Sequence, residues 1–215
     1  MLRFGPDRGP VLLVALPLFE EANRTRAFIV RILRLLGDRG YASALPDLPG
    51  QGESLEPTVE ARLDHWRRAF KCAAAHAAAG RGLTGVLAFR GGALVDALTL
   101  APARWRFAPL TGEELTREMH RVRAAAARNK PEGCAAIEIA GNLLSPELLR
   151  DLQVAIPHDT AGAPLRTVRL DTDPRPADRK LPGPPLWRRS EPAVDETLAA
   201  ALTDDIAAWL SACAA

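Results

Sequence analysis

The sequence is poor in the residues that build the commonest metal and catalytic sites. Its 215 residues include only three cysteines and four histidines. The cysteines, Cys72, Cys134 and Cys213, are odd in number and far apart, which predicts neither a disulfide framework nor a zinc motif. We therefore expect no metal site, and nothing in the sequence indicates another cofactor.

Long apolar runs are absent as well. None approaches the roughly 20 residues that a membrane-spanning helix needs. The first apolar run, residues 11–16, is short and ends at Pro17, so it does not resemble a cleavable signal. These absences favour a cytoplasmic protein without a membrane span.

Charge of one sign is also lacking. The 28 basic residues, of which only Lys71, Lys130 and Lys180 are lysines, face 26 acidic ones, for a net charge of +2. Because no basic tail or aromatic-interleaved basic stripe is visible, we expect no nucleic-acid partner. The apolar content of 47% is ordinary for a globular protein, and the length suits one compact domain over residues 1–215. The oligomeric state is not indicated.

Apolar runs alternate with helical patterns along most of the chain. Strands are predicted at 11–16, 41–45, 85–89 and 165–170, with a weaker candidate at 105–110; helices are predicted at 25–36, 63–79, from about 93, at 113–128, 146–154 and 197–210. Such alternation implies an α/β fold with a doubly wound, mostly parallel sheet. Residues 111–160, with helical patterns around an apolar run at 135–140, indicate a small helical insert or cap. The proline-rich stretch 171–192 is expected to be a loop.

The most informative position is Arg90. Residues 85–95 read as an apolar strand, a glycine turn and a helix start, which is the layout of a G-x-S-x-G nucleophile elbow. Arg90 takes the place of the serine in that frame. A guanidinium stays protonated and cannot act as the nucleophile.

Polar residues follow the predicted strands at the edge where parallel sheets bind ligands. Glu20, Glu21 and Asn23 come after the first strand, although Asn23 is equally well explained as a helix cap. Arg90 is either an anion site at a helix N-terminus or the ion-pair partner of Glu20, Glu21 or Asp171. We predict that it forms a bidentate pair with Glu20 or Glu21.

The partners of a Ser-His-Asp triad are not in place. Asp171 or Asp173, after the last predicted strand, could supply the acid, but no histidine follows His158. The expected order is serine, acid, histidine, so His158 comes too early. The segment 47–54, of pattern D-x-x-G-x-G-x-S, is interpreted as a tight turn in which Ser54 is architectural.

Five segments carry a family resemblance: 17–23 with Arg26, 47–54, 89–93, 138–146 and 183–187. They resemble the α/β-hydrolase superfamily and, more narrowly, the second type of exosortase-A-system-associated hydrolases. The resemblance spans most of the chain and implies a setting beside bacterial exopolysaccharide and protein-sorting genes. It also implies that an arginine at the elbow belongs to the group's own pattern. The chain looks short at both ends of the superfamily's sheet, without antiparallel leading strands.

Three functional hypotheses follow. The leading one is a hydrolase-fold protein without a standard triad that binds a small polar or anionic ligand through Asn23, Arg90, Glu138 and Asp171, near Glu20 and Glu21. The alternative is an atypical hydrolase or acyltransferase in which Glu20 or Glu21 is the base and Arg90 an electrostatic stabiliser. The third is a structural partner protein that docks another subunit near Trp187 and Trp209.

Overall fold

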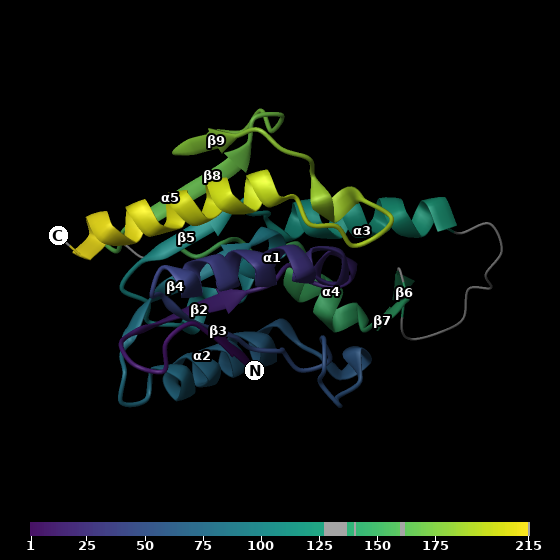
Figure 1. Ribbon diagram of the computed structural model, residues 1–215. Helices are drawn as coiled ribbons and strands as arrows, with labels where there is room; N and C mark the ends of the chain where they lie inside the picture. The colour runs from purple at the N-terminus through teal and green to yellow at the C-terminus, as the bar shows by residue number, and fades with distance from the viewer. Residues whose placement is uncertain (127–136, 140, 160–161, 215) are drawn as a thin grey trace.

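A seven-stranded sheet forms the centre of the molecule (Figure 1). The computed structural model describes residues 1–126, 137–139, 141–159 and 162–214. The strand order is β1-β3-β2-β4-β5-β8-β9, in which only the β1–β3 pair is antiparallel. The strands are β1 Leu2–Phe4, β2 Val11–Ala15, β3 Ala42–Leu45, β4 Leu83–Phe89, β5 Arg104–Phe107, β8 Leu165–Leu170 and β9 Arg179–Leu181. The predicted fold class, a doubly wound and mostly parallel sheet with a small insert, is confirmed.

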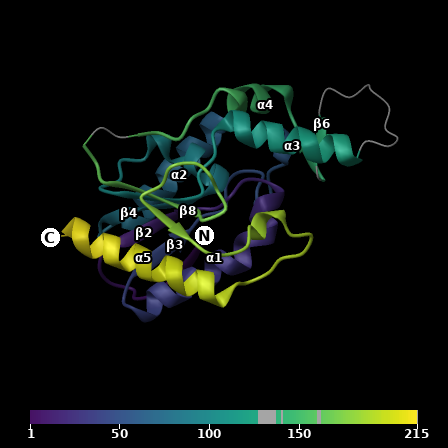
Figure 2. The same ribbon diagram turned by 90° about the horizontal axis from the view of Figure 1, so that it is seen from above.

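Helices cover both faces of this sheet. They are α1 Glu20–Asp38, α2 Leu63–Ala78, α3 Gly112–Ala126, α4 Pro146–Gln153 and α5 Glu196–Ala214. Figure 2 shows α1 and α5 on one side of the sheet and α2, α3 and α4 on the other. The 3-10 turns are η1 Thr58–Glu60, η2 Arg90–Leu94, η3 Asp96–Leu98 and η4 Leu186–Arg188, and a small hairpin pairs β6 Ile137–Ile139 with β7 Asn142–Leu144.

The two faces follow directly from the period of two along a strand. In β2, Leu13 contributes to the core on the α2 side, which includes Trp66 and Phe70. Its neighbour Leu12 contributes to the opposite core, which includes Ile32 of α1. Because both faces are covered, β2 is apolar throughout, as parallel strands between two helix layers generally are.

Several expectations about the elements were wrong. The helix predicted from about residue 93 is instead the pair of turns η2 and η3, because Gly91 and Gly92 are poor helix formers and only a short connection leads to β5. The stretch 171–192 is not all loop, since it contains β9 and η4. An antiparallel leading strand, β1, is also present. A strand of three residues, such as β1 or β9, is too short to give a recognisable pattern of apolar and polar residues.

The polar residues that follow the strands meet at one edge, as predicted. Glu21, Asp47, Arg90 and Asp171 come after the carboxyl ends of β2, β3, β4 and β8, which run parallel within the sheet. Ala15 of β2 lies opposite Ala88 of β4, so the start of α1 and the turn at Arg90 are neighbours. This edge therefore carries the candidate site.

Candidate functional site

The turn at Arg90 has the backbone geometry of a nucleophile elbow. Arg90 follows the last residue of β4 and has a φ of 52°, a strained value for a residue with a side chain. The turn lies against the neighbouring strand: a Cβ added at Gly92 would lie 2.4 Å from the carbonyl oxygen of Leu16. Only glycine fits at that position, so the elbow frame read from the sequence is correct.

Arg90 is buried and held by two carboxylates. Its Nε donates to Glu21 Oε2 at 3.2 Å and its Nη2 to Glu21 Oε1 at 2.8 Å, which is the predicted bidentate pair. Nη2 also donates to Glu118 Oε2 at 2.8 Å, from α3. The guanidinium carbon lies 4.2 Å from the centre of the Trp187 ring, within cation–π range. Arg90 thus ties together α1, α3 and η4, with 3% of its side chain exposed.

Two acids on one guanidinium change the electrostatics of the site. Burial raises the pKa of Glu21 above its ordinary value, and the neighbouring Glu118 raises it further, against the opposing effect of Arg90. Glu118 is the more exposed of the two, with 31% of its side chain accessible against 14% for Glu21.

A pocket of about 440 Å³ opens above this cluster. We call it the apolar pocket, because Leu18, Phe19, Leu115, Met119, Val122 and Ile139 form much of its wall. Glu21 and Glu118 line it, whereas Arg90, which both of them bind, does not. The rest of the described lining comes from Glu20, Arg24, Arg121, Trp187 and Arg188. Its volume is in the range of small-molecule sites. Among the residues that the structure describes, no histidine, serine or cysteine lines it.

A backbone amide of the loop that supplies an oxyanion donor in hydrolases is already engaged. One such donor is a backbone amide in the loop after β2, and the other is the amide of the residue after the nucleophile. In this loop the amide of Phe19 donates to Oε1 of Gln51 at 3.0 Å. Beside Gly91, a Cβ would lie 3.3 Å from Leu115 and 3.4 Å from Leu18, so apolar side chains occupy that space.

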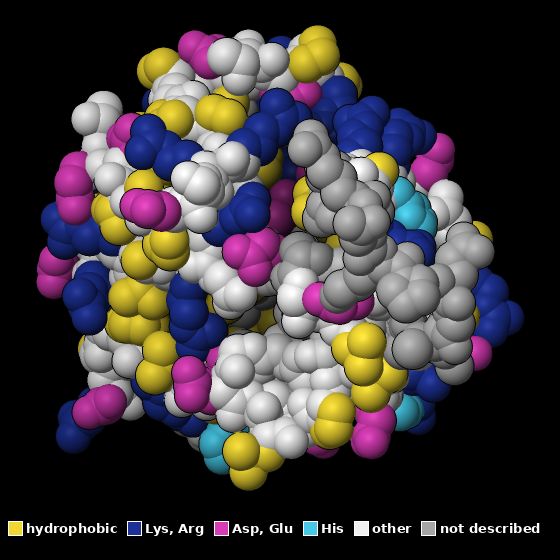
Figure 3. Space-filling model, turned by 90° about the vertical axis from the view of Figure 1, so that its right-hand side faces the viewer, with side chains coloured by type: hydrophobic (Ala, Val, Ile, Leu, Met, Phe, Trp, Pro, Cys, Tyr) yellow, Lys and Arg dark blue, Asp and Glu magenta, His cyan; other side chains and the backbone are white. Residues whose placement is uncertain are grey.

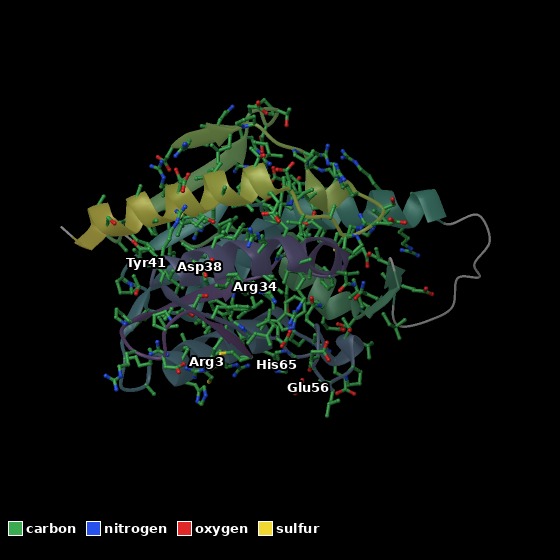
Figure 4. All side chains as sticks on the ribbon, viewed as in Figure 1. Arg3, Arg34, Asp38, Tyr41, Glu56 and His65 are labelled. Carbon is green, nitrogen blue, oxygen red and sulfur yellow. The ribbon has the colours of Figure 1, made fainter. Side chains whose placement is uncertain are left out.

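The candidate triad acid is also engaged. Asp173 accepts from Arg175 and, at 3.0 Å, from Nη1 of Arg169. Hydrogen bonds from Arg175, and then from Arg169, lower the pKa of Asp173 well below its ordinary value despite its partial burial. All four histidines lie on the surface, and Figure 4 shows His65 on the lower side of the molecule with α2. The structure therefore contains no acid–histidine pair at the elbow.

The other predicted site residues are dispersed around this edge. Glu20 lines the apolar pocket, but it lies 3.4 Å from Nε of Arg24 and accepts from Asn23 at 3.3 Å. Asn23 itself lines a separate polar pocket of about 340 Å³ beside Asp47. Glu138 and Asp171 are exposed and line neither pocket.

Three residues of the site were not predicted. Glu118 lies on the face of α3 that also carries Leu115 and Val122, and this helical spacing was readable in the sequence. Trp187 falls in the family-like segment 183–187, but its place under Arg90 depends on η4. Gln51 belongs to a turn interpreted as architectural, and nothing in the sequence indicated that it accepts from Phe19.

Ser54 is indeed architectural. Its hydroxyl accepts from the amides of Gly50 and Glu56, at 3.0 and 3.2 Å. The proposed docking surface has little support, because Trp187 is buried against Arg90 and Trp209 packs partly into the core.

The described part of the chain offers neither a metal site nor a membrane-spanning helix. Within residues 1–126, 137–139, 141–159 and 162–214, no group of three or more histidine, cysteine, aspartate or glutamate residues could hold a metal ion. Across the same described ranges, none of the helices has the length and apolarity needed to cross a bilayer. Cys72 and Cys213 are exposed free thiols, and Cys134 lies outside the described residues.

Comparison with known proteins supports the architecture. No protein-family model and no curated protein matches the sequence. Among solved structures, the chain is similar to Est1E from Butyrivibrio proteoclasticus, which has ferulic acid bound. The TM-score is 0.66 at 16% identity, and the match covers 96% of this chain and 91% of that one. From its sheet order, its elbow turn and this similarity, the chain has the α/β-hydrolase fold.

Proposed function

We propose that this protein binds a small polar or anionic molecule in the apolar pocket and does not use a Ser-His-Asp triad. The observation that carries the proposal is the state of Arg90: the residue at the nucleophile position is buried and bonded to Glu21 and Glu118, two of the acids that line the pocket. The elbow thus shapes the floor of a binding site. We propose a single domain over residues 1–215 in which 111–160 form the cap.

The dual character of the pocket favours an organic ligand with a charged or strongly polar end. Apolar side chains from the loop after β2 and from α3 offer a surface for an uncharged body. Arg121 and Arg188 line the same pocket and are available for a polar end, whereas Arg24 is engaged by Glu20 and by the carbonyl of Trp187. Est1E, of the same fold, holds ferulic acid, which is an aromatic carboxylic acid of this general kind.

The wider setting is proposed from the family-like segments alone. They favour a cytoplasmic protein that works beside bacterial exopolysaccharide or exosortase-associated metabolism. Of the predicted binding residues, Arg90 holds Glu21 and Glu118 in place in this proposal. Asn23, Glu138 and Asp171 are not among the described residues that line the apolar pocket.

The second candidate function is an atypical hydrolase or acyltransferase with Glu21 as the general base. The raised pKa of Glu21 and its place in the pocket lining favour it, because a base is most effective when its pKa lies near the working pH. Both oxygens of Glu21, however, accept from Arg90, and the amide of Phe19 in the loop after β2 already donates to Gln51. Binding without turnover is therefore the better-supported function.

The proposal is tested with ferulate as the probe, by calorimetry and by ester hydrolysis. We expect wild-type protein to bind ferulate and to show no hydrolysis of methyl ferulate above background. Leu115→Trp, which fills the pocket, is expected to weaken binding about tenfold or more. Val154→Trp, at an exposed position outside this pocket, is the matched control and should bind as wild type does. Equal binding by the two variants would contradict the site, and methyl ferulate turnover that Glu21→Gln abolishes would favour the second candidate.

A further inference from the structure

A second cavity, of about 300 Å³, adjoins the apolar pocket. The two share Glu118, Arg121, Trp187 and Arg188 as walls. We call the second cavity the arginine cleft, because five arginines line it: Arg90, Arg117, Arg121, Arg175 and Arg188. Figure 3 shows Lys and Arg side chains gathered on the upper part of the face that contains this end of the molecule.

Some of these arginines are already neutralised. Arg175 donates to Asp173 and to Glu114, both of which line the same cleft. Arg117 pairs with Glu113 on the adjacent turn of α3. These two guanidinium groups therefore have carboxylate partners within the fold.

Two other arginines of the cleft have no carboxylate partner among the described residues. Arg121 and Arg188 are exposed and form no ion pair with any residue that the structure describes. They lie where the apolar pocket and the arginine cleft meet, since both residues line both cavities. The junction of the two cavities thus carries two arginines that have no ion-pair partner among the described residues, beside Glu118, whose carboxylate is bonded to Arg90.

Arg90 adds a buried donor to the same cleft. Its Nε and Nη2 are engaged by Glu21 and Glu118, but its Nη1 has no hydrogen-bond partner among the described residues. This side chain is almost fully buried and lines the cleft. A donor that is held in place by two carboxylates and left open on one side costs little to reorganise when an anion binds.

Clustered guanidinium groups match one chemical class especially well. Their planar donor forks fit the oxygens of phosphate and carboxylate, and arginine is the usual choice for phosphate recognition. A phosphate monoester carries up to two negative charges near neutral pH, which balances the two unpaired arginines. A neutral sugar or a single carboxylate would leave part of that charge uncompensated.

We propose that the arginine cleft binds the phosphate of an organic phosphate monoester whose uncharged body lies in the apolar pocket. Arg121 and Arg188 contact the phosphate at the junction, and Arg90 Nη1 contributes from the floor of the cleft. The inference rests on the proposed function for its apolar half and adds a binding site for the anionic half. It also gives the ligand a direction, with its phosphate on the Arg175 side of Trp187.

Phenyl phosphate is the probe that tests this arrangement. It combines a small aromatic ring with a dianionic phosphate, and its binding is measured by calorimetry on the full chain beside phenyl sulfate, inorganic phosphate and ferulate. We expect phenyl phosphate to bind more tightly than each of the other three. Its binding should weaken with salt, as charge-dependent association does.

Two variants separate the site from general surface charge. Arg121→Ala combined with Arg188→Ala should weaken phenyl phosphate binding about tenfold or more, and should weaken ferulate binding by a smaller factor, because a carboxylate carries only one negative charge. Arg123→Ala, on the same helix but outside both cavities, is the matched control and should change neither. Both variants remove exposed side chains, so circular dichroism should show them folded.

The outcomes distinguish this inference from the proposed function. One outcome refutes the arginine cleft and leaves the apolar pocket standing. In that outcome ferulate binds and Leu115→Trp weakens its binding, but phenyl phosphate binds no more tightly than ferulate, or its affinity is unchanged by the double substitution. If Arg123→Ala weakens binding as much as the double variant does, the effect is one of net charge and the inference is overturned. If neither probe binds at millimolar concentration, both proposals fail.

Discussion

Replacing Arg90 by serine tests the central reasoning of the site. The substitution puts the residue type of ordinary hydrolases at the elbow, with little change in backbone strain, since serine and arginine both carry a Cβ at the φ of 52°. It removes three charged hydrogen bonds, to Glu21 and Glu118, and the guanidinium that lies over Trp187. It therefore leaves two carboxylates and an aromatic ring without their common partner.

The expected cost follows from how deeply each partner is buried. Removing one member of a buried ion pair costs about 3 to 5 kcal/mol, most of it from the charge left behind. Glu118, with 31% of its side chain exposed, regains water, whereas Glu21 at 14% largely does not. We expect Arg90→Ser to lower the free energy of unfolding by about 3 kcal/mol, the lower end of that range. For a domain of this size, such a loss lowers the melting temperature by about 6 to 12 °C.

The loss should also depend on pH in a defined direction. The pKa of Glu21 is already raised by burial, and removal of Arg90 raises it further. A carboxyl whose pKa is higher in the folded state than in the unfolded state favours folding most when it is protonated, and this contribution is lost as the pH rises through the folded-state pKa. The stability gap between Arg90→Ser and wild type should therefore be smaller at pH 5 than at pH 8.

The assay is thermal and urea unfolding at these two pH values, together with hydrolysis of p-nitrophenyl acetate. Arg34→Ser is the control, because Arg34 is exposed on α1 and lies away from the site (Figure 4); it should change stability by no more than about 0.5 kcal/mol. No esterase activity should appear, since no histidine lines the apolar pocket or the arginine cleft to activate the new hydroxyl. Adding Glu21→Gln to the variant should restore part of the stability.

Unchanged stability in Arg90→Ser would refute the ion-pair anchor and mean that Arg90 is solvated or reserved for a ligand. A gap that widens toward pH 5 would show that Glu21 is not the stranded group. New ester hydrolysis would mean that a general base exists where none was identified.

Three further predictions follow from local geometry. A fluorophosphonate probe should label no serine, because the elbow lacks a nucleophile and the Ser54 hydroxyl is held by backbone amides; stoichiometric labelling found by mass spectrometry would revive the esterase reading. Asp173→Asn should lower the free energy of unfolding by about 2 kcal/mol at pH 7, measured in urea. Because the pKa of Asp173 is lower in the folded state than in the unfolded state, its carboxylate stabilises the fold at pH values above the unfolded-state pKa, and the difference between variant and wild type should shrink as the pH falls below about 4. Gly92→Ala should cost about 2 kcal/mol or more, because its Cβ would lie 2.4 Å from the carbonyl oxygen of Leu16 and 2.6 Å from that of Ala15 in β2, whereas Gly80→Ala, with open space around it, should cost only about 1 kcal/mol for its positive φ.

Local pattern was informative wherever a feature depends on neighbours in the chain. The five longer strands of the parallel sheet were found, because continuous apolar runs between helical patterns leave few alternatives. The start of η2 was misjudged, since the glycines that allow the elbow also weaken a helix. The edge strands β1 and β9 were missed because their backbone pairing, and not an apolar pattern, defines them.

In the candidate site, too, some features follow from the sequence alone and others only from tertiary packing. The amino-acid sequence by itself determined that a guanidinium replaces the nucleophile, that no histidine follows the last strand, and that acids and Arg90 share the carboxyl edge of the sheet. Only the tertiary structure decided that Glu21 and not Glu20 pairs with Arg90, that Glu118 joins them and that Trp187 lies beneath the guanidinium. The reason is geometric. Residue order assigns each group to an edge, but which partner a buried charge finds depends on where α3 and η4 pack, and that packing is set by apolar contacts between segments far apart in the chain.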